Sequence, residues 1–245
     1  MRPCRLLVLL APVLLLVATA AYAYVPPADF VLRMVAERRF KLNIVDLTVQ
    51  LATDKPGHKG VIEERIYIKS PERMRRVRQA DGVTTLWVQV EDKAAEGPEG
   101  GLKLVKGNLD LLPILLQPAG SELDDVQVRL VGALKRLGID TTKVTLGRSG
   151  QNVAYVVGGR STDTDKTQLW VDKETYLPIK VVLPKKVGAG VERTEIRWLE
   201  FGSAVTGDWF PRVIEVWKDG KRIERSEVSK VDVNKKVPDT LFTLP

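Results

Sequence analysis

The pattern of hydrophobic and polar residues changes several times along this chain, and it begins with an apolar run. It covers 6–21, follows two arginines and ends in the small-x-small tripeptide Ala21-Tyr22-Ala23. These features predict a secretory signal peptide, residues 1–23, cleaved before Tyr24. No stretch of the mature chain reaches the roughly 20 apolar residues that a transmembrane helix needs. We therefore expect a soluble protein that works outside the cytoplasm.

Helical periodicity is found twice in the mature chain. A first amphipathic helix is predicted over 28–40, with an apolar stripe made of Phe30, Val31, Met34 and Val35. A second helix is predicted to begin near Ser121, where Ser121-Glu122-Leu123-Asp124 resembles a capping box, and to end at Gly138.

The most apolar segment of the mature chain, Leu109–Leu116, precedes the second helix. It is too short to cross a membrane, and Pro113 weakens a continuous helix there. Its aliphatic side chains cannot all be covered by one face of a short helix, so part of this surface must meet a ligand, a partner or the protein interior. The segment is either a short helix buried on all sides or a mobile apolar flap.

A period of two predicts β-strands in the rest of the chain. Before the apolar segment, the predicted strands cover approximately 43–51, 61–69, 74–79 and 83–91. After the second helix they cover approximately 153–157, 168–172, 179–183, 194–201, 213–217 and 222–233. Short turns rich in Gly and Asp separate them, which is typical of antiparallel meanders. The fold class is therefore α+β, mainly antiparallel β.

Composition removes several functional classes. The 38 Lys and Arg residues exceed the 31 Asp and Glu residues, giving a net charge of +7, which falls to +5 without the two signal-peptide arginines. This charge is spread along the chain and is not interleaved with aromatic residues, which argues against nucleic-acid binding. Cys4 is the only cysteine and lies in the signal peptide, so the mature chain has no disulfide and no thiolate nucleophile or metal ligand.

Catalytic chemistry has little support in the sequence. His58, the only histidine, lies in a polar Pro-Gly-His turn, which is typical of a surface residue. The acidic pairs Glu63-Glu64 and Asp124-Asp125 lie on a strand and in a first helical turn, where acids are common, and Asp163-Thr164-Asp165 lacks the rest of a calcium loop. We expect a binding protein with no enzymatic activity, no cofactor and no metal; a secreted hydrolase is a weaker alternative.

The order of elements and four local segments resemble the LolA-like family of periplasmic carriers, the outer-membrane lipoprotein-sorting proteins. The segments are Ile66–Arg75, with a strand, a proline turn and a basic strand, and then Asp81–Val88, Leu169–Pro178 and Val237–Pro245. The resemblance covers nearly the whole mature chain. It implies a single unclosed, strongly curved β-barrel whose concave face is covered by helices, with acyl chains held in the cavity between them.

The resemblance also implies a function and partners. Residues 24–245 would form a lipid-binding domain with helical lid segments at about 28–40 and 109–137. It would shuttle a lipoprotein or other lipid through the periplasm towards the outer membrane as a monomer, meeting an inner-membrane donor complex, an outer-membrane acceptor and, transiently, the membrane surface. The alternative is an envelope sensor or scaffold of the same fold, with a cavity closed by its own side chains and no lipid transport.

Three groups of residues are the candidates for this function. Residues that alternate with polar ones on the predicted strands are expected to line the cavity: Ile66, Ile68, Leu86, Val88, Val90, Leu169, Val171, Ile179, Val181, Ile196, Trp198, Ile214 and Val216. The expected lid consists of Phe30, Met34, Leu109, Leu111, Leu112, Ile114, Leu115 and Leu116. A basic strand would contact a headgroup or an acidic partner, unless its arginines are simply solvated: Arg73, Arg75, Arg76 and Arg78.

Overall fold

A computed structural model describes residues 24–70, 72–106, 111–112, 115 and 122–245. The predicted signal peptide and three expected lid residues, Leu109, Ile114 and Leu116, lie outside the described residues. None of the helices formed by the described residues is long and apolar enough to cross a membrane.

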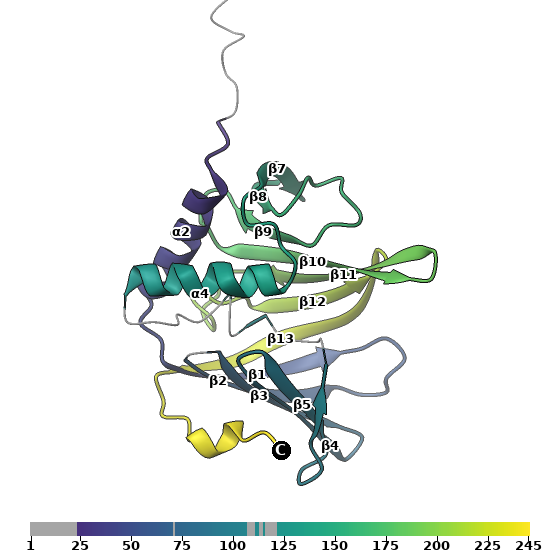
Figure 1. The fold of residues 1–245 in the computed structure, drawn as a ribbon. Coiled ribbons are helices and arrows are strands. Elements are labelled where there is room, and N and C mark those ends of the chain that lie inside the picture. Colours follow the sequence, from purple (N-terminus) through teal and green to yellow (C-terminus); the bar gives the residue numbers. More distant parts are fainter. Residues whose placement is uncertain (1–23, 71, 107–110, 113–114, 116–121) are drawn as a thin grey trace, which may run out of the picture.

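Two antiparallel meanders make up the structure (Figure 1). The first contains β1 (Asp46–Asp54), β2 (Ile62–Lys69), β3 (Arg73–Ala80), β4 (Val83–Val90), β5 (Lys93–Gly97) and β6 (Lys103–Val105). The second contains β7 (Val144–Ser149), β8 (Asn152–Val157), β9 (Gln168–Asp172), β10 (Pro178–Val187), β11 (Gly190–Leu199), β12 (Val213–Lys218) and β13 (Lys221–Val233).

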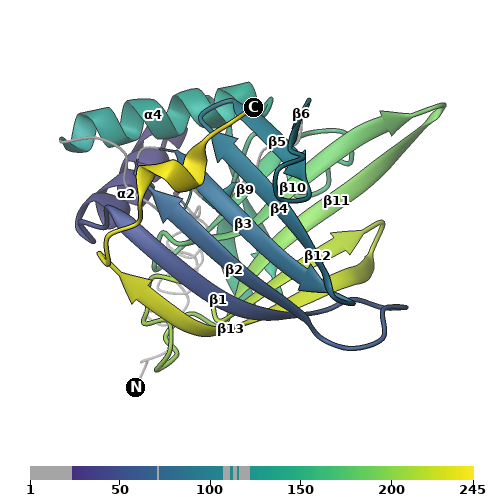
Figure 2. The same cartoon turned by 90° about the horizontal axis from the view of Figure 1, so that it is seen from below.

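The meanders join through their first and last strands. β1 pairs with β13 in the middle of a 13-stranded sheet, and β6 and β7 stand at its two opposite edges. The sheet is therefore strongly curved but unclosed (Figures 1 and 2). This confirms the predicted fold class of a mainly antiparallel, unclosed sheet with helices.

Two helices cover the concave face of this sheet. They are α2 (Ala28–Phe40) and α4 (Leu123–Arg136), which pack against each other and bury their apolar side chains against the sheet. The main hydrophobic core lies between them and the strands. Helix α4 begins after Glu122, whose side chain makes no cap hydrogen bond. Ser121, the first residue of the predicted capping box, lies outside the described residues.

The buried face of α2 differs from the predicted apolar stripe. Its buried residues are Ala28, Val31, Leu32, Val35, Ala36 and Arg39. Phe30 is 44% exposed and packs edge-on against Tyr176, with 6.4 Å between the ring centroids, while Met34 is only half-buried. The expected position of Phe30 over the concave face is therefore wrong, because Leu32 and Ala36 complete a helical stripe that turns Phe30 aside.

A third short element lies on the opposite, convex face. The 3-10 helix η2 (Asp239–Phe242) packs against β3 and β4, on the far side of the sheet from α2 and α4 (Figure 2). In the first meander, β3 and β4 are thus covered on both faces, by different parts of the chain.

Candidate functional site

A cavity of about 80 Å³ opens on the concave face between the sheet and the segment that contains Leu111 and Leu112. Directly opposed residues in antiparallel strands point to the same side of a sheet. The pairs Ile196 with Val216 and Trp198 with Ile214 therefore turn towards the helices together. The residues around the cavity are Leu51, Glu64, Arg76, Leu111, Leu112, Ile196, Trp198, Ile214, Val216, Glu224 and Ser226.

Nine of the thirteen predicted cavity residues lie on the concave face. Four of them line the cavity itself: Ile196, Trp198, Ile214 and Val216. Five others are fully buried in the core beneath the helices: Ile66, Ile68, Leu169, Val171 and Val181. Their binding role stays a prediction, since side chains of this protein already cover these five.

The predicted direction is wrong for Leu86, Val88 and Val90. Val88 is opposed to Arg75, whereas its neighbour Trp87 is opposed to Arg76 and packs against the core of the concave side. All three residues therefore turn to the convex face, where η2 lies against β4. The alternation on β4 was interpreted in the wrong phase because both faces of this strand are covered, so apolar residues occur on both.

The predicted direction is also wrong for Ile179. The register between β10 and β9 shifts between Pro178 and Lys180, which makes Ile179 the extra residue of a β-bulge. Ile179 packs instead against a small convex-face cluster formed by Ala154, Val156, Trp170 and Val182.

The polar groups of the cavity were missed by sequence reasoning. The Glu64 carboxylate accepts hydrogen bonds from Thr53 Oγ1 at 2.5 Å and from Arg78 at 2.9 Å, and Arg76 Nε lies 3.6 Å from its other oxygen. Arg78 also donates to Glu224 at 2.9 Å. One signal was available: Glu64 occurs in phase with Ile62, Ile66 and Ile68, so a charge interrupts an apolar face.

The four arginines of β3 do not form one basic surface. Arg76 and Arg78 turn to the concave face and pair with the acids described above. Arg73 and Arg75 turn to the convex face, where Arg73 donates to Asp239 at 2.7 Å and Arg75 donates to the Leu241 carbonyl at 3.3 Å. One basic surface made of all four arginines is therefore not formed, because alternation along the strand separates them and each has an internal acceptor. Contact of any of them with a headgroup or partner stays a prediction.

Several buried nitrogen-bearing groups on the concave side have no hydrogen-bond partner among the described residues. Trp87 Nε1 and Trp198 Nε1 are two of them, and Trp198 lines the cavity with 1% of its surface exposed. Another is the guanidinium of Arg39 on the buried face of α2. Burial, and to a smaller extent the nearby charge of Arg38, lowers the pKa of Arg39 to about 9. A buried donor without a hydrogen-bond partner lowers the stability of the fold. A ligand that placed an acceptor beside such a donor would therefore bind favourably there.

The described lid residues of the apolar segment belong to the core. Leu111, Leu112 and Leu115 are each no more than 3% exposed, and Leu115 N donates to the Leu111 carbonyl at 2.9 Å. Leu111 and Leu112 also form part of the cavity wall. In this structure they fill space that a ligand would need.

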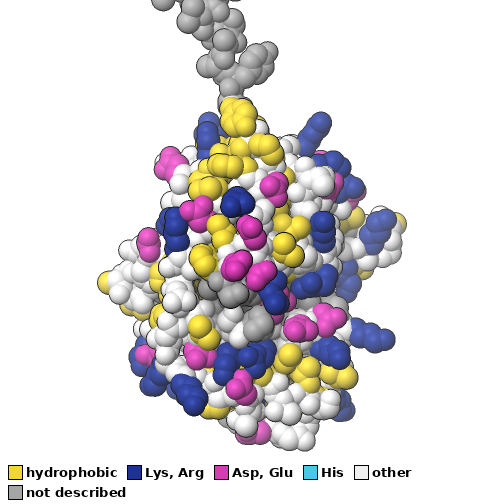
Figure 3. Space-filling view, turned by 60° about the vertical axis from the view of Figure 1, so that its left-hand side comes forward, with side chains coloured by type: hydrophobic (Ala, Val, Ile, Leu, Met, Phe, Trp, Pro, Cys, Tyr) yellow, Lys and Arg dark blue, Asp and Glu magenta, His cyan; other side chains and the backbone are white. Residues whose placement is uncertain are grey.

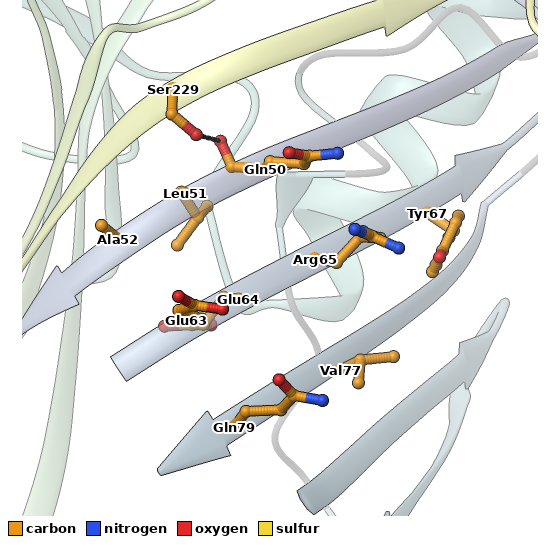
Figure 4. Close-up of a pocket in the computed structure, with 10 residues that line it drawn as sticks. All are labelled: Gln50, Leu51, Ala52, Glu63, Glu64, Arg65, Tyr67, Val77, Gln79 and Ser229. Atoms are coloured by element: carbon orange, nitrogen blue, oxygen red, sulfur yellow. Dashed lines mark hydrogen bonds between the residues drawn. The ribbon is translucent and has the colours of Figure 1, made fainter. Parts of the chain in front are cut away.

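A second hollow, of about 340 Å³, lies over β1, β2 and β3 on the convex face (Figure 4). Its polar side chains, among them Glu63, Arg65 and Gln79, are spread along the strands and do not gather around one point (Figure 4). Ser229 donates to the Gln50 carbonyl at 3.1 Å. The polar side chains of this hollow therefore do not form a binding or catalytic site around one point.

Catalytic and metal-binding constellations are not found in the described part of the chain. No group of three or more His, Cys, Asp or Glu residues there could hold a metal ion. His58 lies 3.6 Å from Asp81 at a surface hairpin. In the space-filling view of the side that bears α2, hydrophobic side chains gather where the described chain begins, and charges of both signs cover much of the rest (Figure 3).

Comparison with solved structures shows a shared fold. No protein-family model and no curated protein matches this sequence. A LolA superfamily protein from Nitrosomonas europaea superposes with a TM-score of 0.53 at 16% identity, covering 90% of this chain and 99% of that one. A domain named for outer membrane lipoprotein sorting, from Vibrio parahaemolyticus, gives a TM-score of 0.56 at 11% identity over 88% and 97% of the two chains. A DUF1329 family protein from Desulfovibrio piger gives 0.53 at 13% over 89% and 98%.

Proposed function

We propose that this protein is a periplasmic carrier that holds the acyl chains of a lipoprotein or another lipid against its concave face and delivers them towards the outer membrane. One observation carries the proposal: an apolar wall of Ile196, Trp198, Ile214 and Val216 meets a buried polar cluster in one cavity. An amphiphile needs both kinds of surface. The fold shared with LolA superfamily structures supports the proposal.

The size of the cavity sets a condition on this function. Pockets for small organic ligands have volumes of about 300–1,000 Å³, and this one has about 80 Å³. Acyl chains therefore enter only if Leu111 and Leu112 leave the wall. Exposing two leucines costs about 3–6 kcal/mol, whereas burying sixteen methylene-sized groups gains on the order of 10 kcal/mol. For an acyl chain taken from water, the exchange favours the loaded state, whereas a chain taken from a membrane is near balance.

The same small volume favours a second candidate function. A sensor or scaffold of this fold would keep its cavity filled by its own side chains and bind a regulatory protein on an outer surface. Leu111, Leu112 and Leu115 satisfy that description as they stand. The two functions differ in whether these leucines move when lipid is offered.

Binding of palmitate and of a diacylated lipopeptide by the mature protein tests the carrier. Ile196→Asp puts a carboxylate in the cavity wall near Glu64 and Glu224 and should weaken binding at least about tenfold, because a desolvated charge is costly. The matched control is Val191→Asp, an exposed position on the same strand, which should bind as the wild type does.

Two further measurements separate the candidates. Mass spectrometry of an organic extract of protein purified from its native envelope should find lipid bound to the carrier. Hydrogen exchange should show lower protection of the Leu111, Leu112 and Leu115 amides when lipid binds. An extract without lipid, together with unchanged exchange under saturating palmitate, would reject the carrier and leave the sensor.

A further inference from the structure

A broad hollow of about 800 Å³ lies against the second meander, remote from the cavity between sheet and helices. Its lining holds four cationic side chains and no acidic one: Leu146, Gly147, Arg148, Val153, Ser161, Trp170, Lys173, Lys180 and Arg193. The register places Trp170, Lys180 and Arg193 on the convex face, because Trp170 is opposed to Lys180 and Arg193 is opposed to Pro184. Cations from β7, β10 and β11 and from the turn after β9 thus meet in one depression.

The indole of Trp170 forms a fixed floor for this hollow. A Cβ added at Gly147 would come within 2.8 Å of the indole, so the ring occupies space that only a glycine leaves free. Trp170 Nε1 donates to the Gln168 side chain at 3.0 Å, and Gln168 in turn donates to the carbonyls of Arg160 and Asp163. The ring therefore cannot turn without breaking a buried network.

Lys180 is a largely buried charge in this hollow. Only 9% of its surface is exposed, and its ammonium lies 3.6 Å from the centroid of the Trp170 ring. The described residues offer that ammonium neither a hydrogen bond nor an ion pair within 4 Å. Glu195, the acid whose charge acts on Lys180, is already engaged by Arg193 at 3.3 Å and by Arg197 at 2.6 Å. An anion that binds beside this buried ammonium would stabilise its charged form.

The titration behaviour of Lys180 agrees with this geometry. Burial lowers the pKa of Lys180, and the charges of Arg197 and Arg193 lower it further, while Glu195 acts in the opposite direction. An anion bound beside the ammonium would raise that pKa again. The positive charge of the hollow is thus not balanced by acidic residues in its lining.

We propose that this hollow binds the phosphate group of an organic phosphate, either a soluble phosphate ester or the headgroup of an anionic lipid. A tetrahedral anion with several acceptor oxygens can meet cations that arrive from different directions, here Lys173, Lys180 and Arg193, whereas a carboxylate is matched by one planar fork. The remaining volume and the apolar lining would hold the organic part. This site is independent of the proposed lipid cavity.

The test is a titration of the mature protein with glycerol 3-phosphate at constant ionic strength, followed by amide and lysine side-chain NMR. We expect saturable shifts at Gly147, Lys173 and Lys180 and an increase in the pKa of Lys180. Lys180→Met keeps the apolar stem of the side chain and should weaken binding about tenfold. Lys173→Met should weaken binding by a similar factor, and it provides the same test if the Lys180 variant folds poorly. Lys186→Met, exposed on the same strand as Lys180, is the matched control.

A second arm distinguishes the two sources of phosphate. The protein should sediment with phosphatidylglycerol vesicles but not with phosphatidylcholine vesicles if the ligand is a lipid headgroup. In that case Lys180→Met and Lys173→Met should lose vesicle binding, and Lys186→Met should retain it. Binding of glycerol 3-phosphate without vesicle binding identifies a soluble ester. The proposal is overturned if neither probe binds saturably, or if binding is the same in wild type and in both hollow variants. Palmitate binding should be unchanged in these variants, so a failure here leaves the carrier function untouched.

Discussion

The two faces of β3 bury their arginines in different ways. On the concave face, Arg76 and Arg78 meet Glu64 and Glu224, which belong to other strands of the same sheet. On the convex face, Arg73 and Arg75 meet η2 and the residues around it, at the end of the chain. Concave charges are thus held by neighbouring strands, whereas convex charges are held mainly by the segment around η2. The two faces of one strand therefore depend on different parts of the chain.

The largest expected effect is on the concave face. Glu64→Ala leaves Arg76 and Arg78 without their shared acid in a largely buried site, and we expect the free energy of unfolding to fall by about 3 kcal/mol. Urea denaturation measures this change. Glu63→Ala, on the exposed side of the same strand, is the control and should change stability by no more than about 0.5 kcal/mol. Equal effects at the two positions would show that the concave ion cluster contributes nothing specific.

A smaller effect is expected from loosening the convex cover. Phe242 is 5% exposed in η2, and Arg73 lies 5.8 Å from its ring centroid. Phe242→Ala should lower the free energy of unfolding by about 2 kcal/mol, below the usual cost in a main core because the tail can adjust. Thr243→Ala, next to it and exposed, should be neutral. Palmitate binding at the concave cavity should not change; a loss of binding would mean that the two faces are coupled.

The smallest expected effect is a pH dependence of the tail. A hydrogen bond from Lys69, helped by the charges of Lys69 and Arg73, lowers the pKa of Asp239 below its ordinary value of 3.8. Because the folded-state pKa is depressed, this contribution is complete above pH 3.8 and is lost as the pH falls through the lower folded-state value. The protection factor of the Phe242 amide, its exchange rate relative to the intrinsic rate at the same pH, should therefore fall as the pH decreases below 3.8. Asp239→Asn should exchange faster at neutral pH and lose most of this acid sensitivity; a variant that still follows the wild-type pH profile would exclude Asp239 as the anchor.

Sequence periodicity predicted the strands better than the directions of their side chains. The fold class and the helix over 28–40 are observed, because long amphipathic patterns depend on local spacing alone. Directions failed at Val88 and Ile179 for non-local reasons: one strand is covered on both faces by distant parts of the chain, and another contains a bulge. The polar cluster around Glu64 joins β1, β2, β3 and β13, and no pattern within one strand reports such a meeting.

The position of β13 has a consequence for how the molecule folds. Each meander consists of neighbouring strands that can pair as soon as they are made, but the two halves join only through β1 and β13, whose paired residues Leu47 and Val233 lie near opposite ends of the chain. Closing so long a loop is slow, and pairing at this sequence separation delays folding. The last of the described strands in chain order thus occupies the centre of the sheet. A chain still lacking it would expose the unpaired edge of β1, so the wait for β13 is the stage at which this protein is most open to misassembly.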